Sequence, residues 1–142
     1  MIFSRLTAFM LAACVGLSGV AHAQETQVLS VELNGAAETE DGSCRLTYVA
    51  ANRTASALDR TAYEVAVFDT QGTVTRLLVL EFGGLIEGKT KILQFDLSGT
   101  PCASISRIVV NDAAGCTVAG AEVPLCMHAL SASSRTAIQF GI

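Results

Sequence analysis

The segment that decides the fold is Tyr63–Leu97, YEVAVFDTQGTVTRLLVLEFGGLIEGKTKILQFDL. It predicts three consecutive strands, at Tyr63–Asp69, Thr73–Phe82 and Thr90–Leu97. The first and third alternate apolar and polar residues, which is typical of a strand with one buried face. The second contains the run Leu77-Leu78-Val79-Leu80, which predicts at least partial cover on both faces. We expect these three strands to form the sheet around which the remaining chain wraps.

Period-two alternation also predicts strands on both sides of this segment. Before it, the expected strands are Gln27–Leu33 and Cys44–Ala50, joined by an acidic, solvated turn. After it, one strand begins at Pro101, and a last strand covers Leu125–Leu130 and Thr136–Phe140 with a break at Ser131–Ser134.

The remaining segments predict loops and no helix. Asn52–Arg60 is small and polar, and Asn111–Pro124 is rich in Gly and Ala. No segment has a sustained apolar stripe with the 3.6-residue period of a helix. The sequence therefore predicts one all-β domain over residues 24–142, an Ig-like antiparallel β-sandwich of about seven strands.

The first 23 residues have the pattern of a cleaved signal peptide. Arg5 provides the positive end, Leu6–Val20 is apolar, and Ala21-His22-Ala23 matches an A-x-A cleavage site. We expect export to the periplasm, a mature chain that begins at Gln24, and no membrane span. A second interpretation is a lipoprotein cleavage box at Leu11-Ala12-Ala13-Cys14, which would leave a lipid anchor on Cys14.

Four cysteines follow the expected cleavage site, and an even number in an exported chain indicates disulfides. If consecutive strands run antiparallel, Cys44 and Cys102 begin strands at the same end of the sandwich. Cys116 and Cys126 then lie together at the opposite end. The predicted bridges are Cys44–Cys102 and Cys116–Cys126.

Charge limits the classes of partner. The chain has 9 Lys and Arg against 13 Asp and Glu, so removal of Arg5 with the signal peptide leaves 8 against 13, a net charge of −5. An acidic domain has no electrostatic basis for binding nucleic acid or anionic lipid. The expected partner is another protein of the cell envelope.

The strand end Val65-Ala66-Val67-Phe68-Asp69 resembles the FxLYD family of exported bacterial Ig-like domains. Val65 stands where that family has its first aromatic residue, Val67 where it has Leu, Phe68 where it has Tyr, and Asp69 matches. Gly72, the loop Leu85–Thr90 and Phe95 extend the similarity, which covers roughly 46–110. The four cysteines are not part of that family's pattern. The resemblance implies a β-sandwich in the envelope with an accessory or binding role, and it implies no catalytic residues.

Three short motifs suggest chemistry, and two of them have a simpler interpretation. Gly83–Thr90 matches the phosphate-binding pattern GxxxxGK[ST], but a strand rather than a helix is expected after it, so we interpret it as a turn. Asn52-Arg53-Thr54 matches a glycosylation acceptor. Cys126-Met127-His128 could bind a soft metal, but strand geometry would place Met127 on the opposite face from the other two.

The predicted function is a non-catalytic accessory or adaptor domain that acts by protein–protein interaction in the periplasm. We expect no enzyme activity, no cofactor and no metal site, because no set of residues forms a coherent catalytic pattern. The alternative is a carrier of a small ligand or soft metal. The expected contact surface is a disulfide-constrained loop that contains Thr117, Val118, Ala119, Gly120, Ala121 and Glu122.

Overall fold

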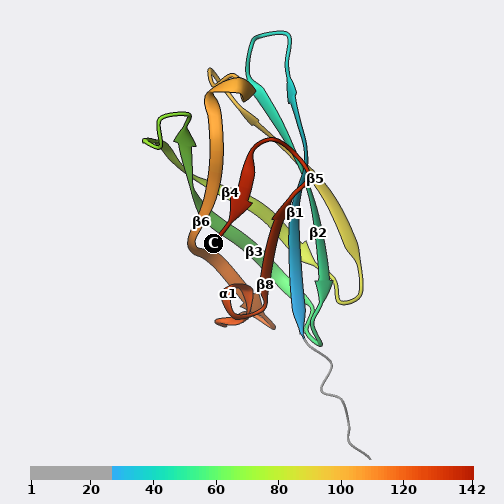
Figure 1. The fold of residues 1–142 in the computed structure, drawn as a ribbon. Helices are drawn as coiled ribbons and strands as arrows, with labels where there is room; N and C mark the ends of the chain where they lie inside the picture. Colours follow the sequence, from blue (N-terminus) through green and yellow to red (C-terminus); the bar gives the residue numbers. More distant parts are fainter. Residues whose placement is uncertain (1–26) are drawn as a thin grey trace, which may run out of the picture.

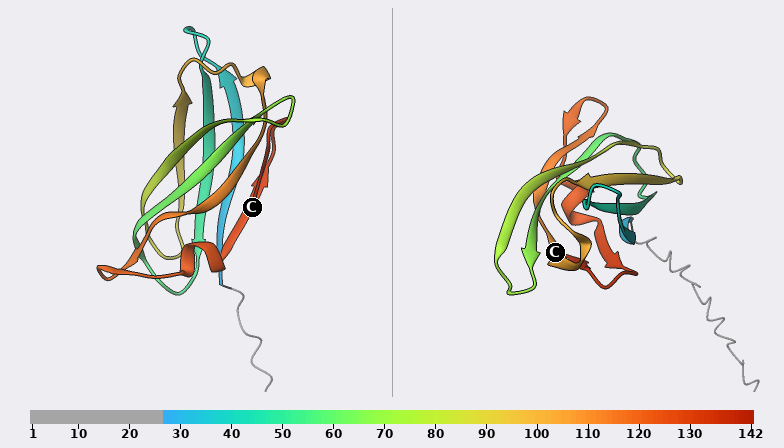
Figure 2. Two further views of the ribbon diagram at one scale, coloured as in Figure 1. Left: turned by 90° about the vertical axis from the view of Figure 1, so that its left-hand side faces the viewer. Right: turned by 90° about the horizontal axis from the view of Figure 1, so that it is seen from above.

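Two β-sheets pack face to face in the computed structural model, which describes residues 27–142 (Figures 1 and 2). The expected signal peptide, its cleavage site and Cys14 lie outside the described residues. Sheet A has four strands in the order β5 (Thr90–Leu97), β2 (Cys44–Arg53), β1 (Val28–Glu38) and β8 (Leu130–Ser134). Sheet B has five, in the order β4 (Val74–Leu85), β3 (Leu58–Asp69), β6 (Ile105–Val118) and β7 (Ala121–Glu122), with β9 (Gln139–Gly141) also beside β6. The all-β sandwich is confirmed, with nine strands instead of about seven.

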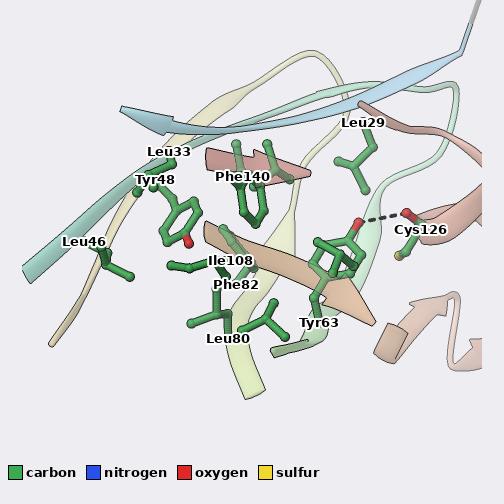
Figure 3. Packing of buried hydrophobic residues seen from close by; sticks show 14 of the residues in the cluster. Leu29, Leu33, Leu46, Tyr48, Tyr63, Leu80, Phe82, Ile108, Cys126 and Phe140 are labelled. Atoms are coloured by element: carbon green, nitrogen blue, oxygen red, sulfur yellow. Dashed lines mark hydrogen bonds between the residues drawn. The ribbon is translucent and has the colours of Figure 1, made fainter. Parts of the chain in front are cut away.

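The core lies between the sheets and is formed by the inward positions that alternation predicted (Figure 3). Leu29, Val31 and Leu33 of β1 are fully buried, and so are the inward residues of β2 and β3. An aromatic cluster joins the two sheets, with ring centroids 5.2 to 6.0 Å apart in edge-to-face geometry; its members are Tyr48, Tyr63, Phe82, Phe95 and Phe140. Such pairs add about 0.5–1.5 kcal/mol each beyond their buried area.

The expectation that Tyr63–Leu97 forms one sheet is wrong. Strands β3 and β4 pair in sheet B, but β5 pairs with β2 in sheet A. The chain crosses between the sheets through the turn 86–89, where Gly88 N–H donates a hydrogen bond to the carbonyl oxygen of Asn52 at 2.8 Å. Strand alternation shows which face is buried, but it does not show which neighbour a strand pairs with.

The predicted loop Asn111–Pro124 is also wrong over most of its length. Strand β6 continues to Val118, turns at Ala119-Gly120 and returns as β7. Gly and Ala have weak strand propensity, but pairing with β3 on one side and β7 on the other outweighs it. The left-handed backbone at Ala119 (φ 49°) and Gly120 (φ 78°) makes the tight hairpin turn.

The C-terminal region differs from prediction in three ways. Leu125–His128 is a short helix, α1, and the strand β8 lies where a break was expected. Strands β8 and β9 pair in parallel with β1 and β6, whereas the prediction was a sandwich of antiparallel strands. The predicted loop Asn52–Arg60 is shorter, because β2 extends to Arg53 and β3 begins at Leu58.

Both predicted disulfides are confirmed. Cys44–Cys102 joins β2 to the 3-10 turn η1 (Cys102–Ser104) that precedes β6, and Cys116–Cys126 joins β6 to α1. Structural disulfides are typical of proteins that fold in an oxidising compartment. In the part of the chain described, no helix is long and apolar enough to cross a membrane.

Candidate functional site: the outer face of sheet B

The outer face of sheet B consists of side chains in rows set by strand register. Residues that are directly paired across strands point to the same side of a sheet. One row contains Val74, Phe68 and Arg107; the next contains Leu77, Ala66 and Val109; the third contains Val79, Glu64 and Asp112. Six of these nine residues are apolar, and we call them the apolar band: Ala66, Phe68, Val74, Leu77, Val79 and Val109.

The apolar band is exposed mainly along β4. Val74, Leu77 and Val79 are 46%, 64% and 50% exposed. This corrects the prediction that the run Leu77–Leu80 has at least partial cover on both faces. Leu80 is buried in the core between the two sheets. In the described part of the chain, no element packs over the outer face of sheet B, where Leu77 and Val79 lie.

An ion pair borders the apolar band on the side of the third row. Arg60 Nη2 lies 2.8 Å from Glu81 Oε2, and this contact raises the pKa of Arg60. The guanidinium lies across the sheet over Ala62 and Gly115, which are both buried. A Cβ on Gly115 would lie only 2.4 Å from Arg60 Nη1, so glycine provides the room for this arrangement.

Opposite charges lie on the two flanking rows. The Arg107 guanidinium carbon is 4.0 Å from the centroid of the Phe68 ring, a cation–π contact, and Arg107 makes no ion pair with any described residue. The third row carries the carboxylates of Glu64 and Asp112. Asn111 Nδ2 donates a hydrogen bond to Glu64 Oε1 at 2.5 Å, and the Ala113 N–H donates to Asp112 Oδ1 at 2.7 Å, so the second oxygen of each carboxylate has no hydrogen-bond partner among the described residues.

The free edge of β4, next to the apolar band, is partly blocked. Lys91 Nζ on β5 donates hydrogen bonds to the carbonyl oxygens of Phe82 at 2.7 Å and Gly84 at 3.3 Å. Arg76 Nη1 donates to the carbonyl oxygen of Ser98 at 2.9 Å. Lysine and arginine at a sheet edge hinder the addition of a further strand. The exposed apolar surface is therefore the face of the sheet, and its edge is protected.

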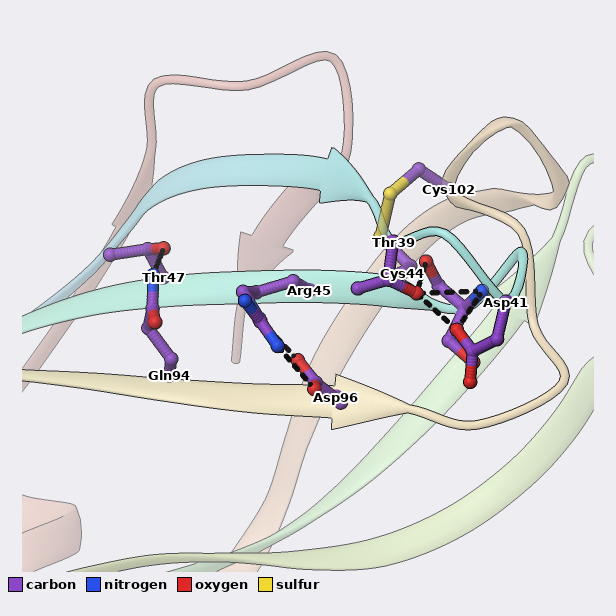
Figure 4. Close-up of polar contacts among 9 residues, drawn as sticks. Thr39, Asp41, Cys44, Arg45, Thr47, Gln94, Asp96 and Cys102 are labelled. Atoms are coloured by element: carbon purple, nitrogen blue, oxygen red, sulfur yellow. Dashed lines mark hydrogen bonds and ion pairs between the residues drawn. A yellow bond between two sulfur atoms is a disulfide. The ribbon is translucent and has the colours of Figure 1, made fainter.

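The outer face of sheet A is mostly polar by contrast, with Val49 and the exposed Ile92 as apolar exceptions, and Figure 4 shows its polar contacts. Arg45 and Asp96 form a two-pronged ion pair with both distances 2.8 Å, and the hydrogen bond from Arg45 is the main cause that lowers the pKa of Asp96. Gln94 Nε2 donates to Thr47 Oγ1 at 3.1 Å. An open hollow of about 580 Å³ lies beside this pair and is lined by charged and small residues of the β1–β2 turn. Ala37 is the one apolar residue in its lining, so the hollow lacks the predominantly apolar lining of small-molecule sites.

The predicted contact surface, Thr117–Glu122, is the tip of the β6–β7 hairpin. Residues 119–122 are exposed, and Gly120 N–H donates a hydrogen bond to Asp59 Oδ2 at 2.9 Å. The disulfide Cys116–Cys126 holds the base of the hairpin, as expected. Its tip carries small residues and one acid, so it offers little apolar surface, and its role in binding stays a prediction.

Two of the short motifs have structural roles. Gly83–Leu85 ends β4, residues 86–89 form a turn, and Thr90 begins β5, so the interpretation as a turn before a strand is confirmed. Asn52 is fully buried, and its Nδ2 donates to the carbonyl oxygens of Ser56 at 2.8 Å and Leu85 at 2.9 Å. A glycan cannot be attached to this nitrogen in the folded protein.

The third motif, Cys126-Met127-His128, lies on α1 rather than on a strand, so the alternation argument for Met127 is wrong. Cys126 is buried and bonded to Cys116, so its thiolate is not free. His128 is exposed at the end of the helix. Within residues 27–142, no three His, Cys, Asp or Glu side chains lie where they could together hold a metal ion.

The sequence did not lead us to predict the apolar band, although two sequence observations point to a second apolar face on β4. The run Leu77–Leu80 is apolar at consecutive positions, which predicts apolar side chains on both faces of its strand. No amphipathic helix pattern exists elsewhere in the chain to cover the second face. Together these observations identify a second apolar face without a candidate helix to cover it, but only the fold shows whether another segment lies over it.

Comparison of the chain with protein-family models, with curated proteins and with solved structures finds no match. The resemblance to the FxLYD family therefore stays a prediction, and the site is interpreted from its own geometry.

Proposed function

We propose that the domain is a non-catalytic accessory or adaptor protein that binds another protein through the apolar band. The observation that carries this proposal is the exposure of Val74, Leu77 and Val79 side by side on a sheet face that no described element covers. Scattered exposed apolar residues are ordinary, but a contiguous apolar surface with a polar border marks an interaction site.

The proposed location is the periplasm. The signal-peptide pattern of residues 1–23 supports this location, and the two disulfides fit an oxidising compartment. The resemblance of residues 65–69 to an exported Ig-like family also agrees with an accessory role in the envelope.

Binding through the face is favoured over strand addition at the edge. Strand addition needs free backbone N–H and C=O groups along an edge strand. On β4, Lys91 occupies two of the carbonyl oxygens, and Arg76 reaches across to Ser98. The exposed side chains of Leu77 and Val79 need no such backbone access.

Site-specific crosslinking in the cell tests this proposal. The photoreactive residue p-benzoylphenylalanine is placed at Leu77 and, as a matched control, at Ile92 on the outer face of sheet A. The two positions are similarly exposed, at 64% and 68%. We expect a protein adduct from position 77 and none from position 92. Equal adducts from both positions, or none from position 77, would show that the apolar band is not the binding surface.

A further inference from the structure

We propose that the partner bound on the apolar band is a second copy of this chain, in a two-fold symmetric dimer. This inference rests on the proposed function and deepens it, because it names the occupant of the same surface. The argument uses the order of the rows on the face and the signs of the charges on them.

One half-turn brings the three rows of the outer face of sheet B into a self-complementary arrangement with the same rows of a second copy. The axis lies in the plane of contact, perpendicular to the strands and level with the row that contains Leu77, Ala66 and Val109. Rotation by half a turn places this apolar row on its own copy and exchanges the two rows beside it. Self-complementarity of this kind is what a two-fold interface requires.

The same rotation brings opposite charges together. Each residue keeps its strand under the rotation, so Arg107 on β6 faces the β6 residue of the exchanged row in the second copy, which is Asp112. Glu64 lies beside Asp112 in that row. The contact occurs twice, once in each direction, and it pairs a guanidinium that has no carboxylate partner among the described residues.

The other two-fold arrangement is less favourable. A two-fold axis parallel to the strands and level with β3 would place β4 of one copy over β6 of the other. Arg107 would then lie over Val74 of the second copy, where no charged side chain could pair with it. Charge complementarity therefore selects the first arrangement. Two sheets packed through their faces in this way would bury Leu77, Val79 and Val109 as the inner residues of a sandwich are buried.

Mixing of charge-reversed variants tests the arrangement. Arg107→Asp places two acids opposite each other in its own dimer, and Asp112→Arg places two arginines opposite each other. A mixed dimer contains one chain of each variant. At one of its contacts the introduced aspartate faces the introduced arginine, and at the other the unsubstituted Asp112 faces the unsubstituted Arg107, so both contacts are restored. Sedimentation equilibrium from about 1 µM to about 100 µM measures the association.

We expect the unsubstituted protein to dimerise, each variant alone to bind itself at least about tenfold more weakly, and the equimolar mixture to dimerise again. The control Arg45→Asp reverses a charge on the outer face of sheet A and leaves the dimer intact. Circular dichroism verifies that every variant keeps its β-sheet content.

Two outcomes would overturn the dimer. One is an unsubstituted protein that stays monomeric over this concentration range, and the other is a mixture no more dimeric than its components. The proposed function fails separately. If the protein is monomeric but position 77 crosslinks to a chain of different mass, the apolar band binds another protein and only the second copy is excluded.

Discussion

Sheets A and B have similar inner faces and different outer faces. Each contributes a buried tyrosine and alternating aliphatic residues to the core, namely Tyr48 in sheet A and Tyr63 in sheet B. On the outside, sheet A carries the ion pair between Arg45 and Asp96 and the Gln94–Thr47 hydrogen bond. Sheet B carries the apolar band.

Folding of a two-layer sandwich explains the apolar inner faces and a polar outer face, but it does not explain an apolar outer face. A two-layer sandwich buries one face of each sheet, and water solvates the other face. The polar outer face of sheet A fits that requirement without further explanation. The apolar outer face of sheet B does not fit that requirement, and this is the basis of the proposal that it becomes buried on association.

The largest expected effect comes from the two disulfides, which act at different places. Cys44–Cys102 closes a span of 58 residues between sheet A and the start of β6, and Cys116–Cys126 closes 10 residues beside sheet B. In the chain-entropy account, the double substitution Cys44→Ala/Cys102→Ala lowers the free energy of unfolding by about 4 kcal/mol, and Cys116→Ala/Cys126→Ala by about 3 kcal/mol. Urea denaturation measures both. A larger loss from the shorter span would show that local packing of α1 matters more than loop closure.

Removal of the hydroxyl group is expected to change the free energy of unfolding differently at the two buried tyrosines. Tyr63 Oη donates to the carbonyl oxygen of Cys126 at 2.8 Å, whereas Tyr48 Oη is buried without a hydrogen-bond partner among the described residues. Tyr63→Phe should lower the free energy of unfolding by about 1 kcal/mol, and Tyr48→Phe should leave it unchanged or raise it by about 1 kcal/mol. Equilibrium denaturation compares the two. Destabilisation by Tyr48→Phe would indicate a buried water bonded to that hydroxyl.

Glycines on the two sheets provide a matched pair with a smaller effect. Gly115→Ala in sheet B displaces the Arg60 guanidinium from its position beside Glu81 and should lower the melting temperature slightly, because the pair is exposed and contributes little. Gly35→Ala in sheet A places a Cβ 3.6 Å from Thr47 Cβ, which is ordinary contact, so no loss is expected. Thermal denaturation of the two variants side by side measures this. Equal melting temperatures would mean that Arg60 finds another position at no cost.

The smallest effect concerns the polar outer face of sheet A in acid. The hydrogen bond from Arg45 is the main cause that lowers the pKa of Asp96 in the folded state. A carboxyl group with a lowered folded pKa stabilises the protein above its unfolded pKa, and this contribution disappears as the pH falls through the folded pKa, below about pH 4. Asp96→Asn should therefore reduce the loss of stability between pH 7 and pH 3, and Arg45→Gln should do the same. Unchanged acid sensitivity in both variants would show that the exposed pair contributes nothing.

Much of the inner architecture follows from short-range patterns in the sequence. The alternation at Leu29, Val31 and Leu33 correctly identifies the buried face of β1, and the same reasoning holds for β2 and β3. The cysteine pairing was also predicted correctly, although the pairing of the strands between the cysteines was not. The predicted cysteine pairing is correct because it depends only on the end of the sandwich at which each strand begins.

The wrong predictions concern segments whose contacts with residues far away in the chain outweigh the local conformational preference of their own residues. Residues 111–118 have weak strand propensity, yet they form a strand because β3 and β7 pair with them. Asn52 looks like a surface acceptor in its three-residue motif, and it is buried because Ser56 and Leu85 provide carbonyl oxygens for its amide.

The sequence by itself determined an all-β domain, the inward face of each early strand and the two disulfides. These follow from period-two alternation, from the even number of cysteines after residue 23 and from the end of the sandwich at which each cysteine-bearing strand begins. The tertiary structure alone decided that β5 pairs with β2 in the other sheet, and that no element within residues 27–142 packs over Val74, Leu77 and Val79 on the outer face of β4. The physical reason is that alternation specifies which face of a strand avoids water, whereas its neighbours and its cover depend on residues far away in the chain.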